Sequence, residues 1–267
     1  MEINGMPNVL ACDVGNTRIR FAHVCGEQVY EPRSFAIGDL SELGTGIGVI
    51  WNQMPAPRKV VASSVSPSGL RALEAAVSDA INEDVLVIGR DINLPMPTHL
   101  PDESAIGTDR LCAAVAAYDR LGVACIVADF GTAATVDAID ADGVFMGGAI
   151  FPGISMSAKS LKSHTAELPE VTPRSPEQLI GKNTENAIIS GVVHSARGAL
   201  RELVEAYAIE MNSWPTVILT GGDASLVCPH VGESDLVQAV VPDLTLRGVA
   251  ITYYRQVADR MRLEDEE

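Results

Sequence analysis

The chain has 267 residues, 47% of them hydrophobic, which is enough for one large or two small domains with a sizeable core. Its formal net charge is −16, from 35 acidic and 19 basic residues, and the basic residues form no cluster. Duplex-binding proteins need a basic surface, so this balance argues against nucleic acid as a partner. The longest apolar run, residues 121–128, is far shorter than the roughly 20 residues of a membrane span. No signal peptide is visible at the N-terminus, and we expect a soluble, cytoplasmic protein.

The first half of the chain alternates strand and helix patterns. Short apolar or alternating runs predict strands, and apolar residues at intervals of three and four predict helices. The expected strands are 9–12, 17–24, 28–30, 59–65 and 85–88, and the expected helices are 67–81 and 107–121. Gly26 and Glu27 predict a hairpin turn. Residues 90–106, with three prolines, predict a long polar loop.

The second half repeats this alternation. We expect strands at 124–128, 134–140 and 143–150, and a further strand from residue 216 that enters a glycine turn by 224. The expected helices are 154–161, 184–211 and 244–261, and a loop with three prolines spans 162–181. The five cysteines form no CxxC pair, and no histidine stands at zinc-ligand spacing, so we expect buried free thiols in a reducing cytosol.

One pattern occurs twice. An apolar strand leads into DVGNT at 13–17, and an apolar strand leads into DFGTA at 129–133; an alternating strand follows each copy. We therefore expect an α/β protein of two similar domains, 1–120 and 121–267, with a cleft between them. Mixed sheets with helices on both faces are the natural architecture for such a chain.

The two repeated turns have the chemistry of a phosphate site. Glycine lets the backbone approach a ligand closely, and successive N–H groups form an anion-binding hollow. The hydroxyls of Thr17 and Thr132 can add donors, while the carboxylates of Asp13 and Asp129 can hold Mg²⁺ or another cation. A single such motif is more often an ordinary hairpin turn, but two copies in matched contexts favour the binding site.

Two further motifs matter. LTGGDA at 219–224 ends a strand in Gly221 and Gly222, against which a flat base can lie. GTDR at 107–110 opens a helix, and its Asp109 has two interpretations. The carboxylate can simply favour the positive end of the helix dipole, or it can take part in a reaction.

Together the three glycine motifs resemble the actin, hexokinase and Hsp70 superfamily. That resemblance implies two ribonuclease-H-like domains that clamp ATP, with a divalent metal and domain closure. A narrower resemblance, to the type III pantothenate kinase family, covers nearly the whole chain. It rests on the ordered strings DVGNTRIR, GTDR, DFGTAATVDAI, GGAIFPGI, KSLKSHTAELPEV, GKNTENAIISG and LTGGDA.

The family resemblance implies an activity: transfer of phosphate from ATP to the 4′-hydroxyl of pantothenate, the first step of coenzyme A biosynthesis. It also implies a homodimer, Mg²⁺, and a monovalent cation, K⁺ or NH₄⁺. Two alternatives stay open: a superfamily kinase for another small hydroxylated substrate such as a sugar, and a kinase-derived regulatory protein.

The resemblance also implies roles for the substrate residues. Asp109 would be the general base, and Arg110 with the backbone of Gly107 and Thr108 would hold pantothenate. A carboxylate that accepts the hydroxyl proton, and an arginine that grips the substrate carboxylate, suit this chemistry. Thr184 would contact pantothenate from the partner subunit; the other interpretation, not exclusive, is a helix N-cap.

The remaining site residues follow the same resemblance. Asp129 would bind the monovalent cation. The residues that would bind ATP or its metal are Asp13, Val14, Gly15, Asn16, Thr17, Arg18, Ile19, Arg20, Thr132, Gly221 and Gly222. One position departs from the family pattern: Leu100 stands on the substrate loop where the family usually has a tyrosine, so the pocket would lack a phenol hydroxyl.

Overall fold

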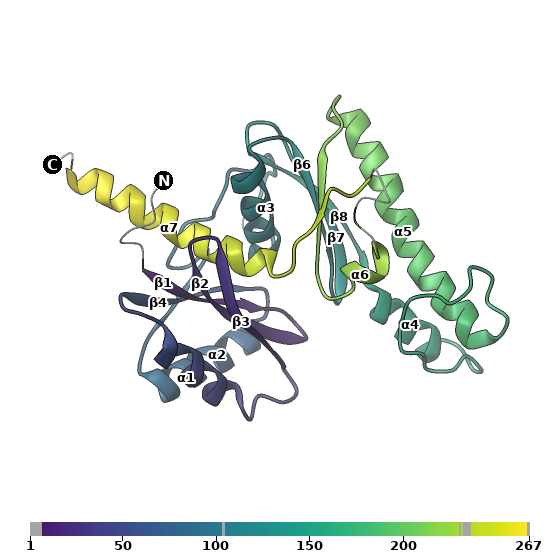
Figure 1. Cartoon of the computed structure of the whole chain (residues 1–267), viewed down its shortest axis with the longest axis horizontal. Helices are drawn as coiled ribbons and strands as arrows, with labels where there is room; N and C mark the ends of the chain where they lie inside the picture. The colour runs from purple at the N-terminus through teal and green to yellow at the C-terminus, as the bar shows by residue number, and fades with distance from the viewer. Residues whose placement is uncertain (1–6, 103–104, 230, 232–235, 266–267) are drawn as a thin grey trace. The chain divides into compact units, whose positions relative to one another are not determined.

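The computed structural model describes residues 7–102, 105–229, 231 and 236–265. The chain forms two compact units, one made of residues 1–120 with 243–267 and the other of residues 121–242. Each unit is built on a five-stranded mixed sheet. Figure 1 shows both units along the chain.

The first sheet has the order β3-β2-β1-β4-β5. Its strands are β1 (Asn8–Val14), β2 (Arg18–Cys25), β3 (Gln28–Ala36), β4 (Arg58–Ser64) and β5 (Val85–Val87). The pairs β1/β2 and β2/β3 are antiparallel, and β2 and β3 are joined by the expected turn at Gly26 and Glu27. The pairs β1/β4 and β4/β5 are parallel, so the carboxyl ends of these three strands meet at one edge.

Helices cover both faces of this sheet, as Figure 1 shows. Even-numbered residues of β1, such as Leu10 and Val14, pack in the cluster that includes α1 (Leu43–Gln53) and α2 (Pro67–Ile81). Odd-numbered residues of β1 pack against α7 (Leu244–Asp265) and against Cys112 of α3 (Thr108–Leu121). Because side chains alternate along a strand, Asp13 belongs to the face that α3 and α7 cover.

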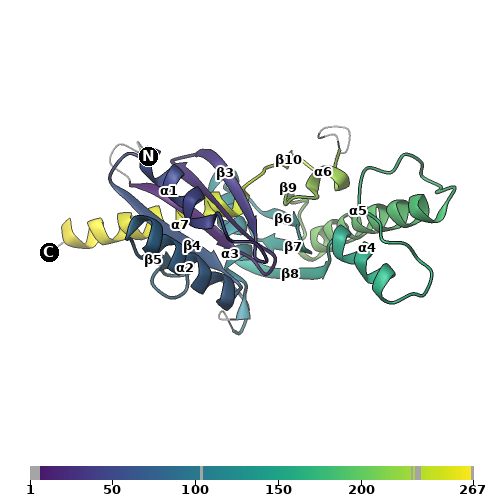
Figure 2. The ribbon, with the colours of Figure 1, turned by 90° about the horizontal axis from the view of Figure 1, so that it is seen from below.

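The second sheet has the order β10-β9-β6-β7-β8. Its strands are β6 (Cys125–Phe130), β7 (Ala133–Ile139), β8 (Phe145–Pro152), β9 (Thr216–Thr220) and β10 (Ala239–Val240). Its core joins β6, β7 and β9 to α4 (Ile154–Ser163), α5 (Thr184–Glu210) and the short α6 (Ala224–Val227). Figure 2 shows α4 and α5 side by side.

The two sheets have the same topology. Three antiparallel strands are followed by two parallel ones, so β6, β7, β8, β9 and β10 correspond to β1, β2, β3, β4 and β5. This duplication confirms the predicted α/β fold with two ribonuclease-H-like mixed sheets. The copies differ at the first turn: four residues separate the last pair Val14 and Ile19, whereas three separate Phe130 and Ala134.

The last helix differs from the expectation. We expected residues 121–267 to form the second domain, but α7 belongs to the first unit. Leu246, Val249 and Ala250 of α7 are buried in the cluster that contains Val9 and Ala11 of β1. The chain therefore returns to its first sheet after completing the second, because α7 covers an apolar sheet face there.

Two other segments also differ. The sequence analysis missed α1, whose three glycines (Gly44, Gly46 and Gly48) lower helix propensity, although its buried residues Leu43, Ile47, Ile50 and Trp51 have helical spacing. The loop at 90–106 was expected to be polar, yet Ile92, Met96 and Ile106 are buried. Its path follows α7: the N–H of Asn93 donates to Gln256 and Arg255 donates to the carbonyl of Pro95.

All five cysteines are free thiols, and four of them are buried. Among the described residues, no helix is both long enough and apolar enough to cross a membrane.

Helices α3 and α7 approach closely at one glycine, which gives a test of the packing. A Cβ on Gly248 would overlap the backbone carbonyl of Cys112. We expect Gly248→Ala to lower the free energy of unfolding by about 1–3 kcal/mol or more, as overpacking does. Thermal and denaturant unfolding measure the change.

The matched control is Gly48→Ala in α1 of the same unit, where an added Cβ meets no atom within 4 Å. Alanine is there expected to raise stability by up to about 1 kcal/mol, since it has the higher helix propensity. Equal effects of the two substitutions would contradict the close α3–α7 packing.

Candidate functional site

The turn after β1 presents backbone groups and polar side chains at the carboxyl edge of the first sheet. Asp13 is half-buried and lies opposite Arg20 of β2 and Ser63 of β4 in the strand register. The turn is closed by a hydrogen bond from the N–H of Gly15 to the carbonyl of Arg18, 3.0 Å. Asn16 and Thr17 are exposed. A ligand at this edge would therefore meet exposed side chains beside a carboxylate.

The side chains of the predicted ATP segment do not all reach this surface. Val14 and Ile19 are fully buried in the core, so they can offer a ligand only their backbone. Arg18 donates to the hydroxyl of Ser34 at 2.6 Å and to its carbonyl at 3.2 Å. Arg20 forms an ion pair with Asp243. Both arginines are thus positioned by the protein itself, and a phosphate would have to compete with Ser34 and Asp243 for them.

The GTDR motif begins α3 and is packed tightly. A Cβ on Gly107 would lie 2.5 Å from a carboxylate oxygen of Asp109 and 3.3 Å from Val65. Glycine at this position therefore leaves the room that the carboxylate occupies. The N–H of Arg110 donates to the Asp109 carboxylate at 2.8 Å, so the acid also stabilises the first turn of its own helix.

The electrostatics join this helix to the turn after β1. Burial raises the pKa of Asp109, and the N–H and the positive charge of Arg110 offset part of that rise. Burial also raises the pKa of the Cys112 thiol, and the charges of Asp13 and Asp109 raise it further. Cys112 of α3 packs with Val9 and Ala11 of β1, on the sheet face to which Asp13 belongs. The helix that begins at Asp109 therefore covers the same face of the first sheet as Asp13.

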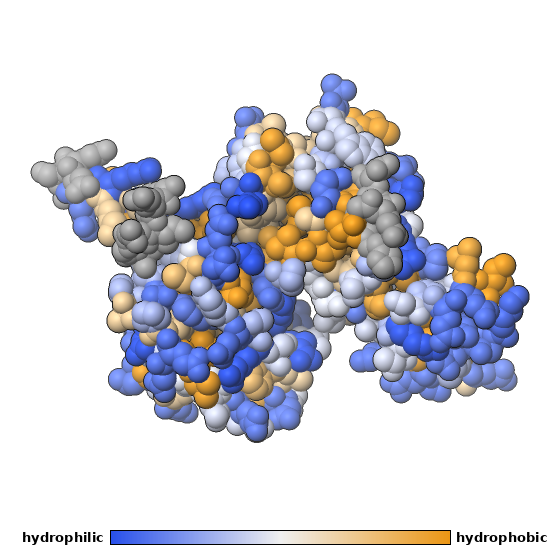
Figure 3. Space-filling view, viewed as in Figure 1, coloured by the Kyte–Doolittle hydropathy of each residue, from blue (hydrophilic) through white to orange (hydrophobic). Residues whose placement is uncertain are grey.

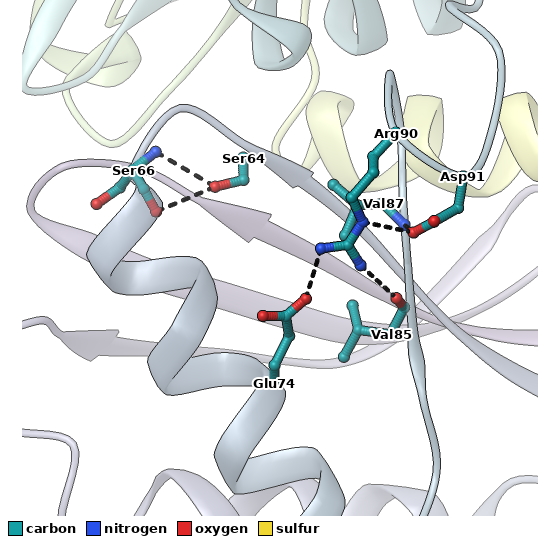
Figure 4. Close-up of polar contacts among 7 residues, drawn as sticks. All are labelled: Ser64, Ser66, Glu74, Val85, Val87, Arg90 and Asp91. Carbon is teal, nitrogen blue, oxygen red and sulfur yellow. Dashed lines mark hydrogen bonds and ion pairs between the residues drawn. The ribbon is translucent and has the colours of Figure 1, made fainter.

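The substrate loop begins with an ion-pair network, shown in Figure 4. Arg90 donates to Glu74 of α2 at 2.8 Å, to Asp91 at 2.9 Å and to the carbonyl of Val85 at 3.3 Å. Asp91 in turn accepts from the N–H of Val87 at 2.9 Å, a bond that lowers the pKa of its carboxyl. These contacts fix the loop to the end of β5.

Residues 89–97 of this loop line a surface hollow. Leu100 lies outside that lining; it is half-buried, and its N–H donates to the hydroxyl of Thr98 at 3.1 Å. Residues 103 and 104 lie outside the described part of the chain.

In the second unit the corresponding turn is built around close glycines. A Cβ on Gly221, which has a φ of +94°, would overlap Asp129 and lie 2.5 Å from the carbonyl of Phe130. A Cβ on Gly153 would lie 2.6 Å from the carbonyl of Thr132, so α4 begins against the turn that holds Thr132. Gly222 is exposed with open space around it. The structure thus brings together Asp129, Thr132 and Gly221.

Thr184 is exposed at the first position of α5. The interpretation of Thr184 as the N-cap is wrong, because Asn183 occupies that position and its side chain accepts from the N–H of Asn186 at 2.8 Å. The Thr184 hydroxyl is therefore not needed to cap the helix. Arg174 contacts Glu185 at 2.7 Å and Asn186 at 3.2 Å, which ties the preceding loop to this end of α5.

Several residues at these sites were not predicted. Ser63 and Ser64 contact Thr108, Asp243 holds Arg20, and Asp223 lies half-buried beside the second turn, where burial raises its pKa and its N–H donates to Phe130. The available signals were a serine pair at a strand end and an aspartate after Gly222. The sequence around Asp243 contains no signal for its ion pair, since its partner Arg20 is far away in sequence.

Comparisons with known proteins identify the family. The family model for type III pantothenate kinase matches residues 9–206. A type III pantothenate kinase from Moorella thermoacetica is 34% identical over 255 residues, covering 92% of this chain and 99% of that protein. Another from Syntrophotalea carbinolica is 35% identical over 263 residues, covering 92% and 98%.

Solved structures show the fold alone. Component A of (R)-2-hydroxyglutaryl-CoA dehydratase from Acidaminococcus fermentans is similar with a TM-score of 0.56 and 15% identity, covering 95% of this chain and 100% of that one. MreB5 of Spiroplasma citri, bound to ADP, has a TM-score of 0.51 at 11% identity, covering 97% and 99%. With the family model matching most of its length and relatives above 30% identity over nearly all of it, the chain belongs to the type III pantothenate kinase family.

Proposed function

We propose that the protein transfers the γ-phosphoryl group of ATP to the 4′-hydroxyl of pantothenate, with Asp109 as the general base. The reaction follows from membership of the family, which makes the chain a pantothenate kinase in coenzyme A biosynthesis and favours pantothenate over a sugar as acceptor. The observation that supports the role of Asp109 is its place at the start of α3, the helix that packs on the sheet face to which Asp13 belongs.

Asp109 suits proton abstraction from an alcohol. A carboxyl whose pKa is raised by burial is a stronger base than an ordinary aspartate. Arg110, the next residue, would attract the pantothenate carboxylate. The backbone of Gly107 and Thr108 would complete that contact. Leu100 would line the pocket with an apolar surface where a phenol could have donated a hydrogen bond.

The turn after β1 would hold the ATP phosphates. The exposed side chains of Asn16 and Thr17 suit anions, and Arg18 and Arg20 supply positive charge. The half-buried Asp13 offers the oxygen ligand that Mg²⁺ prefers, so it would hold this ion, which neutralises phosphate charge during transfer. In the second unit Thr132, Gly221 and Gly222 would contact ATP.

Asp129 would bind the monovalent cation, K⁺ or NH₄⁺. Its carboxylate is half-buried at the end of β6, and its register partners are the oxygen-bearing residues Thr135 and Thr220. Oxygen donors of this kind suit a hard cation. The cation would offset the negative charge that Asp129 places at the turn.

The dimer would share its substrate site through Thr184. Just before α5, Leu179 and Ile180 each have 71% of their surface exposed, although their backbone is held by a 2.6 Å hydrogen bond from the buried Ser190 to the carbonyl of Leu179. Figure 3 shows apolar atoms at the surface of the second unit. A fixed and exposed apolar pair beside Thr184 suits contact with a second copy of this chain.

The first prediction concerns the base. We expect Asp109→Asn to lower kcat by about 10²–10⁴-fold while ATP still binds, because asparagine cannot accept the proton. ADP release with pantothenate, coupled to a spectroscopic assay, measures the rate, and calorimetry measures ATP binding. Asp79→Asn, on the exposed side of α2, is the control and should keep wild-type turnover. Near-normal turnover of Asp109→Asn would exclude the base role.

The same variant, Asp109→Asn, is also expected to change the thermal stability of the protein. A carboxyl with a raised pKa binds its proton more tightly in the folded than in the unfolded state, so its contribution to stability falls as pH rises. Asparagine removes that cost and can still accept from the N–H of Arg110. We therefore expect Asp109→Asn to have a higher Tm than wild type at pH 7, with the gain vanishing below about pH 4. A lower Tm at pH 7 would contradict the burial of this charge.

The second prediction concerns the cation. We expect low activity in Na⁺ alone and recovery in K⁺ or NH₄⁺, and we expect Asp129→Asn to remove the difference between the salts. The exposed Asp142, on the β7–β8 turn, provides the control substitution Asp142→Asn, which should keep the salt dependence. Equal wild-type rates in all three salts would count against a cation at Asp129.

The third prediction concerns the shared site. We expect a homodimer by light scattering at micromolar concentration. Mixing inactive Asp109→Asn with inactive Thr184→Arg should restore activity, because each mixed dimer would have one site with an intact Asp109 and an intact Thr184. An active monomer, or no recovery after verified subunit exchange, would refute the sharing.

A further inference from the structure

The side chain of Thr108 joins the start of α3 to the end of β4. Its hydroxyl lies 3.1 Å from the hydroxyl of Ser63 and 3.1 Å from the N–H of Ser64, and it lies 3.3 Å from the carbonyl of Ser64. Three hydrogen bonds thus link the first residue of the helix to the last two residues of the strand.

These bonds use the full capacity of one hydroxyl. A threonine hydroxyl has one proton to donate and two lone pairs that accept. It donates to the Ser64 carbonyl and accepts from the Ser64 N–H, and the Ser63 hydroxyl supplies the remaining donor. The hydroxyl therefore has no remaining donor or acceptor position for a ligand. The side chain of Thr108 therefore acts inside the protein, whatever its backbone contacts.

Ser63 extends the connection toward Asp13. It is fully buried, and it lies directly opposite Asp13 in the parallel register of β1 and β4. Its hydroxyl lies 3.1 Å from the hydroxyl of Thr108. A buried hydroxyl without such a partner would cost free energy, so this contact of Ser63 restricts where α3 can lie.

The position of Asp109 depends on where α3 lies. Its carboxylate accepts from the N–H of Arg110 on the same helix, and Gly107 just before it leaves no spare room. A shift of the helix start along β4 would therefore carry the carboxylate with it. Positional errors near 1 Å can cost about 10²-fold in rate.

We propose that Thr108, supported by the buried Ser63, is a positioning residue that fixes the catalytic Asp109 relative to Asp13. The Thr108 hydroxyl bonds the start of α3 to β4, the strand beside β1. The distance between the carboxylates of Asp109 and Asp13 is thereby held constant. This role rests on the proposed function of Asp109. It leaves the proposed backbone contact of Thr108 with pantothenate unchanged, and it gives a role to two serines at a strand end.

The test compares two substitutions at one position. Thr108→Val keeps the shape and removes the hydroxyl, whereas Thr108→Ser keeps the hydroxyl and removes the methyl group, which lies beside Gly89. We expect Thr108→Val to lose about 10–100-fold in kcat with the KM for pantothenate and for ATP unchanged. We expect Thr108→Ser to keep most of kcat. Ser63→Ala, which removes only one of the three bonds, should lose less than Thr108→Val.

Steady-state rates by ADP release give kcat and both KM values, and thermal unfolding checks that each variant is folded. Wild-type kcat in Thr108→Val would overturn the proposal, and so would equal losses in Thr108→Val and Thr108→Ser. A higher KM for pantothenate at unchanged kcat would mean that the hydroxyl binds substrate. If Thr108→Val does not fold, unchanged kcat in folded Ser63→Ala would overturn it instead. The proposed function fails separately, if the wild-type protein does not turn over pantothenate.

Discussion

The parallel pairing of β1 with β4 is the constraint on which the first unit depends. It sets Asp13 directly opposite the buried Ser63, and the hydrogen bonds of Ser63 and Ser64 then hold Thr108 at the start of α3. A slip of one residue would turn Asp13 into the apolar cluster under α1 and α2. Burial of Leu10, Cys12 and Val14 in that cluster therefore fixes the side of the sheet to which Asp13 belongs.

The two sheets share one topology, but the turns that follow their central strands differ. In both units an aspartate ends the central strand and a glycine turn follows, but the surroundings differ. The first turn is one residue longer and lies in the same unit as α3, whose Asp109 shares the Cys112 environment. The second turn is confined by Gly153 and Gly221, whose missing side chains allow backbone and Asp129 to come together. The first turn thus shares its unit with the proposed base Asp109, and the second turn holds the proposed cation ligand Asp129.

Burial of Asp109 links its proposed role as the base to a cost in stability. The acid lies at a helix start, where the dipole and the N–H of Arg110 favour its charge, while the loss of water raises its pKa. Helix α7 packs closely against α3, since Gly248 permits the backbone of Cys112 to come close. A carboxylate that is costly to bury thus requires rigid neighbours, and they come from three segments far apart in sequence.

Local patterns determined much of this protein. Strand alternation, helical spacing and the repeated DxG turns predicted both sheets, most helices and the family, because these signals reside in neighbouring residues. Tertiary structure alone decided the rest. The return of α7 to the first unit, the pair of Arg20 with Asp243 and the bonds of Ser63 to Thr108 join residues distant along the chain. Helix α1 was not predicted, because its glycines lower helix propensity, although the packing of the helix tolerates them. Such contacts depend on which faces meet once the apolar surfaces are buried, and no single segment encodes that.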